Sequence, residues 1–161
     1  VDQLPPFDDY AMAGRTYRYF TGKPLYPFGY GLSYTRFAYG SPKLSTASLK
    51  AGETLGVDVP VKNVGAVAGD AVPQLYLEFP KIPGTPIRAL RGFTRVSLAP
   101  GEEKVVHFNL APRDLMSVTD AGDPVVAAGG YRLSVGEGQP GTGAPTASAD
   151  FKIAGTMALP E

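Results

Sequence analysis

The stretch Leu55–Lys62, LGVDVPVK, is the clearest indication of the fold class, because its apolar residues recur at every second position. These apolar residues are Leu55, Val57, Val59 and Val61. Side chains of a β-strand point alternately to opposite faces, so the pattern predicts a strand with one buried face. Pro60 lies inside the run and indicates an edge strand or a bulge, because proline has no N–H to donate.

Further segments on both sides of this stretch also have strand character. They lie at residues 37–44, 74–79, 88–98, 103–110, 124–127, 131–135 and 151–153. Since no stretch has a helical period, the pattern predicts an all-β fold, an antiparallel β-sandwich of the immunoglobulin or fibronectin type III kind with seven to eight strands.

Glycine and proline predict the interruptions between and within these strands. Gly92 indicates a break or a bulge in the 88–98 segment, and Pro100-Gly101 fits the centre of a type II turn. The Gly-rich segment 136–145 is expected to be a flexible hairpin loop, too loose to form a rigid site. A single helical turn is expected at residues 114–117.

The first part of the chain has a different composition. Of the 9 Tyr and 8 Phe residues, eleven lie between Phe7 and Tyr39. Gly and Pro recur too often there for a helix longer than one turn. We therefore expect an irregular, extended N-terminal arm at residues 1–36 and the β-sandwich at residues 37–161. Since so many exposed rings would promote aggregation, the rings of the arm are expected to bury against a partner surface.

Charge and cysteine content argue against several classes of protein. The chain has 15 Lys and Arg and 15 Asp and Glu, and this zero net charge argues against a nucleic-acid partner, which needs a basic face. Without cysteine the chain has no disulfide and no thiolate metal site. No apolar run reaches the ~20 residues of a membrane span, so no membrane partner is expected. Because the first residue is Val1, we expect the chain to be a piece of a longer protein.

A search for catalytic residues finds no convincing arrangement. His107 is the only histidine, and its position between Val106 and Phe108 predicts a solvent-facing side chain on a strand. Asp8 and Asp9 point to opposite sides in an extended chain, so they cannot easily flank one substrate atom. The other acidic residues considered are expected to form local turns and lack the spacing of a calcium loop; they are Asp114, Asp120 and Asp123. We therefore expect no catalytic residue, no cofactor and no metal site in this chain.

The arm carries a long run, GRTYRYFTGKPLYPFGYGLSYTRF at residues 14–37, that resembles a segment of glycoside hydrolase family 3, the β-glucosidases and β-xylosidases. In that family the segment leads into a C-terminal fibronectin type III-like domain. Shorter stretches resemble the same family in the same order; they lie at residues 63–65, 68–70, 74–76, 90–93, 98–102, 113–115 and 130–136. The sequence departs from the family at Pro73, where relatives usually have a β-branched residue, and in the loop after Gly136.

The resemblance implies that the parent protein is a retaining O-glycosyl hydrolase of carbohydrate metabolism that acts on terminal β-glucosides or β-xylosides. In this family a barrel carries a nucleophilic Asp beside a Trp, and an α/β sandwich usually supplies the acid/base Glu. This chain has no Trp and is shorter than a barrel of ~250 residues, so no catalytic residue of the family can be placed on it. It is then a non-catalytic accessory domain that packs against the barrel and the α/β sandwich and stabilises them. The resemblance favours a periplasmic or secreted location, and a cytoplasmic one is also compatible.

The arm is expected to provide the contacts with the catalytic domains. The residues expected at this interface are Arg15, Tyr17, Arg18, Tyr19, Phe20, Tyr26, Phe28, Tyr30 and Tyr34. The rings would lie in grooves of the partner domains, and the charged groups of Arg15, Arg18 and Asp9 would fix the register. An oligosaccharide near the arm is also compatible with these rings. The alternative is a stand-alone carbohydrate-binding or protein-interaction module.

Overall fold

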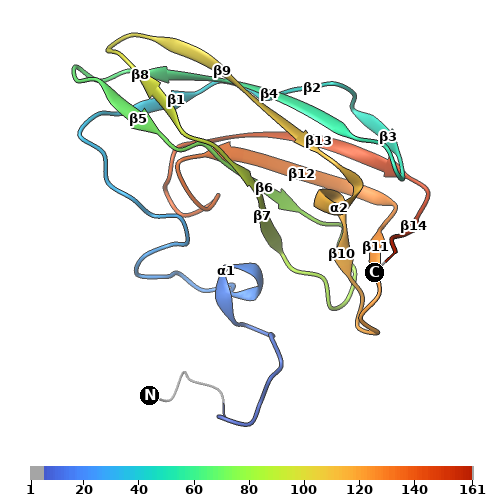
Figure 1. Ribbon diagram of the computed structural model, residues 1–161. Helices are drawn as coiled ribbons and strands as arrows, with labels where there is room; N and C mark the ends of the chain where they lie inside the picture. The colour runs from blue at the N-terminus through green and yellow to red at the C-terminus, as the bar shows by residue number, and fades with distance from the viewer. Residues whose placement is uncertain (1–5, 161) are drawn as a thin grey trace.

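Two β-sheets packed face to face form the body of the chain in the computed structural model, which describes residues 6–160 (Figure 1). The first sheet consists of β1 (Phe37–Tyr39), β2 (Lys43–Leu44), β4 (Leu55–Asn63) and β9 (Glu103–Leu110). The second has the strand order β3 (Ser48–Lys50), β13 (Thr146–Ala154), β12 (Gly129–Gly136), β6 (Gln74–Glu78) and β7 (Arg88–Phe93). The pairings are antiparallel except that of β3 with β13, which is parallel. The predicted all-β sandwich is therefore confirmed.

Two small sheets lie at opposite ends of the sandwich (Figure 1). One pairs β5 (Gly69–Ala71) with β8 (Val96–Leu98), and the other contains β10 (Ser117–Val118), β11 (Pro124–Val126) and β14 (Met157–Ala158). The helices of the described residues are single turns, α1 (Thr16–Tyr19) and α2 (Pro112–Leu115). The turn predicted at residues 114–117 starts at Pro112 instead, because proline is well placed in a first helical turn and the Asp114 carboxylate accepts a hydrogen bond from the Ala111 N–H at 2.9 Å.

The hydrophobic core lies between the two main sheets and follows from the alternation along β4. The apolar residues of β4 are buried at every second position, and Val57, Val59 and Val61 are fully buried. They share one apolar cluster with residues of the second sheet, namely Leu75, Leu77, Leu133, Val135 and Phe151. Each fully buried Val or Leu side chain stabilises the fold by about 1.5–3 kcal/mol, so this cluster is the main source of stability.

Pro60 lies in an inner strand, so the prediction of an edge strand or a bulge at this position was wrong. Strand β4 pairs with β9 along one side and with β1 and then β2 along the other. Between β1 and β2 the Gly40 N–H donates to the Pro60 carbonyl at 2.8 Å. Because the N and O atoms of one strand residue point to the same side, the missing N–H of Pro60 faces the break between β1 and β2, where no ladder bond is lost.

The predicted strand segments all contain strands, but two of them are divided. Segment 37–44 becomes β1 and β2, and segment 88–98 becomes β7 and β8. The bulge predicted at Gly92 is confirmed, since Leu75 pairs with Gly92 while Tyr76 pairs with Leu90. A Cβ atom at Gly92 would lie 3.0 Å from the Phe108 ring, so the close approach of the two sheets also favours glycine there.

The side chain of Asn63, at the end of β4, connects four separate parts of the chain through hydrogen bonds. Its side-chain amide donates to the Val67 and Leu98 carbonyls at 2.8 and 3.1 Å, and its side-chain oxygen accepts from the Gly65 N–H at 3.0 Å. The same oxygen accepts the Thr35 hydroxyl at 2.7 Å, which anchors the end of the arm to the sandwich. Asn63 is fully buried, so loss of its amide would leave several polar groups without partners.

We predict that Asn63→Ala destabilises the fold by about 2–4 kcal/mol, because buried donors and acceptors lose their partners. Urea unfolding followed by circular dichroism measures the change. The matched control is Asn109→Ala, since Asn109 is an exposed residue of β9 and its loss should change the free energy of unfolding by less than about 0.5 kcal/mol. Equal effects of the two substitutions would contradict the role given to Asn63.

Candidate functional site

The arm docks on its own sandwich through three aromatic rings. The rings of Tyr17 and Phe28 stack with centroids 4.0 Å apart and an angle of 12° between their planes. Both meet the Tyr76 ring of β6 edge to face, at centroid distances of 6.1 and 6.5 Å. Tyr76 is fully buried, and burial raises the pKa of its hydroxyl above the ordinary value. The stacked pair therefore covers the face of β6 that points away from the sandwich core.

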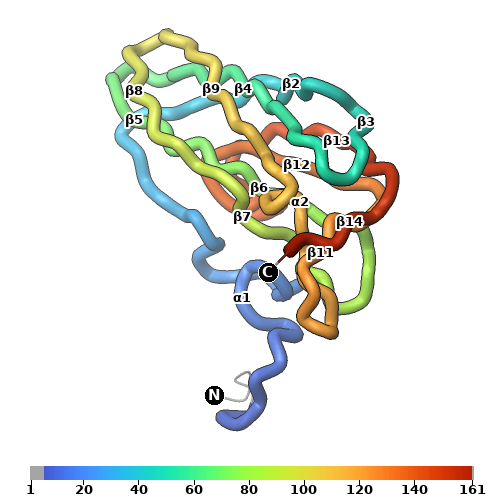
Figure 2. Tube along the Cα trace, turned by 45° about the vertical axis from the view of Figure 1, so that its right-hand side comes forward, coloured from blue at the N-terminus to red at the C-terminus, as the bar shows by residue number. Residues whose placement is uncertain are grey.

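The helical turn α1 covers the edge of the second sheet. Strand β7 is the last strand of that sheet, and α1 lies beside it (Figures 1 and 2). The Ile87 N–H donates to the Arg18 carbonyl at 2.7 Å, and the Leu90 N–H donates to the Tyr17 hydroxyl at 3.0 Å. An uncovered edge strand presents free N–H groups to other chains, so this part of the arm protects the sheet from edge-to-edge association.

A tight turn after Phe28 is held by polar groups of the sandwich. The Gln74 side-chain amide donates to the carbonyls of Gly29 and Glu137 at 3.1 and 3.0 Å, and the Gln139 N–H donates to the Phe28 carbonyl at 3.2 Å. Gly29 has a φ of +77°, and a Cβ atom there would lie 2.1 Å from the Gln74 side-chain oxygen. Only glycine both adopts this positive φ without strain and leaves room for the Gln74 side chain. The hydrogen bonds of this turn hold the arm against β6.

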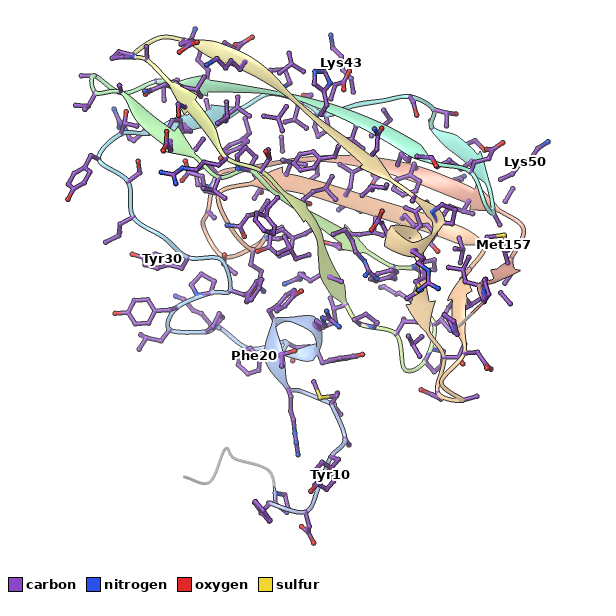
Figure 3. The ribbon with its side chains drawn as sticks, in the orientation of Figure 1. Tyr10, Phe20, Tyr30, Lys43, Lys50 and Met157 are labelled. Atoms are coloured by element: carbon purple, nitrogen blue, oxygen red, sulfur yellow. The ribbon has the colours of Figure 1, made fainter. Side chains whose placement is uncertain are left out.

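Several other large apolar side chains of the arm are exposed. Leu32 and Tyr34 are 89% and 99% exposed, Tyr26 is 70% exposed, and Leu25, Phe7 and Tyr10 are similarly open. Figure 3 shows Tyr10 at the end of the arm far from the sandwich. We call Leu25, Tyr26, Leu32 and Tyr34 the outer face of the arm. A surface of this kind is typical of a protein–protein contact.

The structure separates the arm residues predicted from the sequence into docked and exposed groups. Tyr17 and Phe28 dock on Tyr76, and Arg18 contributes its carbonyl to the edge of β7. Tyr19 is half-buried, and Arg15 pairs with Asp9 at 3.4 Å within the arm. The remaining predicted rings are exposed; they are Phe20, Tyr26, Tyr30 and Tyr34. The first five residues of the predicted arm lie outside the described range.

Gln74, Tyr76 and Gln139 were not among the predicted site residues. A signal for Tyr76 is present in the sequence, because QLYLEF has large apolar side chains at successive positions and therefore on both faces of a strand. In the structure Leu75, Tyr76 and Leu77 are all buried. A strand buried on both faces requires a cover on its outer side, and the arm provides it.

A groove of about 980 Å³ lies between the arm and the loop that joins β12 to β13. Its walls are the arm at residues 20–31 and the loop at residues 137–145, and Arg88 is among the other lining residues. This loop does not project freely as the sequence analysis expected, since Gly138, Gln139 and Pro140 are buried. Glu137 also lines the groove, and burial raises the pKa of its carboxyl, although that carboxyl accepts a hydrogen bond from the Phe37 backbone.

His107 takes part in a surface contact away from the arm. The His107 ring lies 2.6 Å from the Asp58 carboxylate on the exposed side of the first sheet, as expected for a solvent-facing histidine. Between residues 6 and 160 no three acidic or histidine side chains gather in a way that could hold a metal ion. None of the described helices is long and apolar enough to cross a membrane.

We predict that the arm contains a boundary near residue 14 that separates a dispensable part from a structural part. Deletion of residues 1–13 should change the free energy of unfolding by less than about 0.5 kcal/mol, because none of the hydrogen bonds and ring pairs of residues 6–13 involves Tyr76 or β7. Deletion of residues 1–36 should lower it by several kcal/mol and should promote association, because Tyr76 and the edge of β7 lose their cover. Chemical unfolding and analytical ultracentrifugation measure both effects, and equal stability of the two truncated chains would refute this boundary.

Comparison with known proteins places this architecture in a family. Residues 71–139 match the model of the Fibronectin type III-like domain. The chain is 43% identical over 122 residues to a beta-xylosidase of Formosa agariphila, an alignment that spans 74% of this chain and 17% of the relative. It is 39% identical over 163 residues to a probable beta-glucosidase D of Aspergillus flavus, spanning 89% of this chain and 20% of the relative.

Solved structures agree with this assignment. The structure of beta-glucosidase 3B from Thermotoga neapolitana in complex with glucose superimposes with a TM-score of 0.77 at 33% identity, covering 89% of this chain and 19% of that one. The chain thus spans about a fifth of the length of the relatives that it matches. The resemblance stated from the sequence is confirmed, and the chain belongs to the fibronectin type III-like domains of family 3 β-glucosidases and β-xylosidases.

Proposed function

We propose that the chain is a non-catalytic accessory domain of a retaining β-glycosidase and that it packs against the catalytic domains and stabilises them. The parent would hydrolyse terminal β-glucosides or β-xylosides. The names of the relatives and the small share of each relative that the chain covers support this proposal. In a retaining enzyme two carboxyl groups act on one glycosidic bond, and this chemistry would belong to the other domains of the parent.

The two-sided arm is the observation that carries the proposal. Its inner rings are docked on the sandwich, while Leu32 and Tyr34 on its outer face remain almost fully exposed. Burial of each exposed ring against a partner would contribute about 2–3 kcal/mol. Because the inner contacts already hold the arm in place, its ordering costs little when the partner binds. The outer face is therefore suited to contact the barrel and the α/β sandwich of the parent.

The alternative of a stand-alone carbohydrate-binding module receives less support from the exposed rings. Sugar-binding platforms present coplanar rings, whereas the Tyr26 and Tyr30 rings are tilted by 54° at a centroid distance of 5.5 Å. The rings also belong to an irregular arm and not to a strand. The contact residues proposed for the catalytic domains are accordingly the exposed ones of the predicted set, namely Phe20, Tyr26, Tyr30 and Tyr34, with Arg15 and Arg18 as polar partners.

We predict that replacing Leu32 and Tyr34 together by Ser lowers the thermal stability of the parent enzyme and leaves its kcat/KM nearly unchanged. Each lost apolar contact should cost about 2 kcal/mol of interdomain stabilisation, while no group near the reacting atoms is altered. The rate of thermal inactivation, measured by hydrolysis of an aryl β-glucoside or β-xyloside, gives the result.

The matched control for this pair is Val105→Ser, since Val105 is a half-exposed apolar residue of β9 on the other sheet. It should leave the inactivation rate unchanged. Binding of a hydrophobic dye to the 161-residue chain should fall in the Leu32→Ser, Tyr34→Ser variant and not in the control. An unchanged inactivation rate in the double variant, or hydrolysis of these substrates by the purified 161-residue chain, would refute the proposed function.

A further inference from the structure

Strand β9 forms an open edge of the first sheet (Figure 1). Its eight residues pair with β4 along one side, and no strand of the described residues pairs with its other side. Strand β8 is joined to β9 by the turn at residues 99–102, but the two strands share no ladder. An open edge presents backbone N–H and C=O groups on which a further strand can pair.

The hydrogen bonds of β4 determine which residues of β9 point outward. The Gly40 N–H donates to the Pro60 carbonyl at 2.8 Å, and the Ser45 N–H donates to the Gly56 carbonyl at 2.9 Å. Pro60 and Gly56 therefore direct their backbone groups away from β9, and the residues that alternate with them bond to β9. The observed register then leaves every second residue of β9 with its backbone groups on the open side; these residues are Glu103, Val105, His107 and Asn109.

The open side of β9 lacks the features that normally protect a sheet edge. Apart from the ladder with β4, no backbone–backbone hydrogen bond within residues 6–160 involves its four outward residues. The strand has no proline, and its eight-residue register with β4 has no bulge. Its lysine, Lys104, donates to the Ser97 carbonyl at 2.8 Å and is thus drawn toward β8. By contrast, α1 covers the edge of β7, and β1, β2 and β3 have only two or three residues each.

The side chains along this edge are complementary to a second copy of themselves. Glu103 and His107 stand at equal distances on either side of Val105 in the sequence. When two copies of β9 pair antiparallel about a two-fold axis at Val105, Glu103 of each copy lies opposite His107 of the other, and the two Val105 side chains meet. Opposite-charge and apolar pairs stabilise neighbouring strands, whereas like charges directly opposite each other destabilise them.

The groups that meet in this arrangement are accessible. Val105 is 48% exposed, Glu103 is also exposed, and none of the ion pairs within residues 6–160 includes Glu103. The His107 Nδ1 atom lies 2.6 Å from the Asp58 carboxylate, which leaves the Nε2 atom for another group. An imidazolium ring donates from both nitrogens, so it can bridge Asp58 of its own chain and Glu103 of the second copy.

We propose that two copies of the chain associate through β9, which pairs antiparallel with itself in a register centred on Val105. Glu103, Val105 and His107 of the two copies then exchange about six backbone hydrogen bonds. This interface is smaller than that of a stable dimer, so we expect a dissociation constant of about 50–500 µM. Val105→Ser remains a valid control for the arm contacts, because the pair is dissociated at the sub-micromolar concentrations of those measurements. The association is independent of the accessory role, since the outer face of the arm takes no part in it.

Sedimentation equilibrium of the 161-residue chain at concentrations up to about 1 mM tests the association. We expect a monomer–dimer equilibrium that Val105→Pro weakens at least about tenfold, because proline removes an outward N–H and no bond to β4. Val105→Lys should have a similar effect, since it places like charges opposite each other at the two-fold axis. The matched control is Val118→Lys on β10, where Val118 is 47% exposed; it should change the dissociation constant by less than about twofold.

Circular dichroism and urea unfolding show whether each variant is folded, and Val105→Lys decides should Val105→Pro not fold. A chain that stays monomeric at the highest concentration would overturn the proposal. Folded Val105 variants that dimerise as the unaltered chain does would also overturn it. Association that persists in these variants but is lost in the Leu32→Ser, Tyr34→Ser variant would assign the contact to the outer face of the arm, against the proposal.

The register has a separate test because the chain has no cysteine. Directly opposite residues of a hydrogen-bonded antiparallel pair have Cα atoms about 5.5 Å apart, within the range of a disulfide. Val105→Cys should therefore give a disulfide-linked dimer under mild oxidation, seen on a non-reducing gel. Asn109→Cys is the control, since it lies on the same open edge but its two copies would be ~27 Å apart. Absence of the linked dimer with Val105→Cys, or equal linkage with Asn109→Cys, would overturn the proposed pairing.

Discussion

The stacking of Tyr17 and Phe28 on the buried ring of Tyr76 is the contact on which the position of the arm depends. The sandwich alone would expose the outer side of Tyr76 and would leave the N–H groups of Ile87 and Leu90 open at the edge of β7. The arm covers the Tyr76 ring and provides hydrogen-bond acceptors for both N–H groups. This contact also positions residues 20–34, because they follow α1 directly. It therefore determines where the arm lines the groove and how the outer face of the arm is oriented.

Alternation of apolar residues predicted the main strands because the two sheets bury one side of each. It could not predict the short strands β10 and β14, since two residues have no period, and it did not separate β2 from β1. The pattern also wrongly predicted an edge strand or a bulge at Pro60. An interior proline is tolerated where the neighbouring strand is interrupted, and the interruption beside Pro60, at Gly40, depends on how the strands pair in the folded sheet. Gly101 was predictable because the turn at Pro100-Gly101 requires a positive φ, which is 76° here. The bulge at Gly92 was predictable because a glycine inside a strand is typical of one.

The arm could be recognised in the sequence from its aromatic residues. The sequence could not predict which of these rings face the sandwich and which face solvent. An irregular segment has no period that assigns alternate residues to opposite faces, so Tyr17 and Tyr34 look equivalent in sequence. In the structure one is docked and the other is 99% exposed. What separates them is the position of Gln74 and Tyr76, which lie far along the chain and become neighbours of the arm only when β6 is in place.

The same contacts that dock the arm also shape the groove between the arm and the β12–β13 loop. The Gln74 amide bridges the carbonyls of Gly29 in the arm and Glu137 in the loop, so it holds the two walls of the groove at a fixed separation. Gln139 donates to Phe28 and is itself buried. A loop rich in glycine would otherwise sample many conformations, and fixing them costs entropy on folding. Because the Gln74 and Gln139 hydrogen bonds join this loop to the arm, the loop and the arm are ordered together.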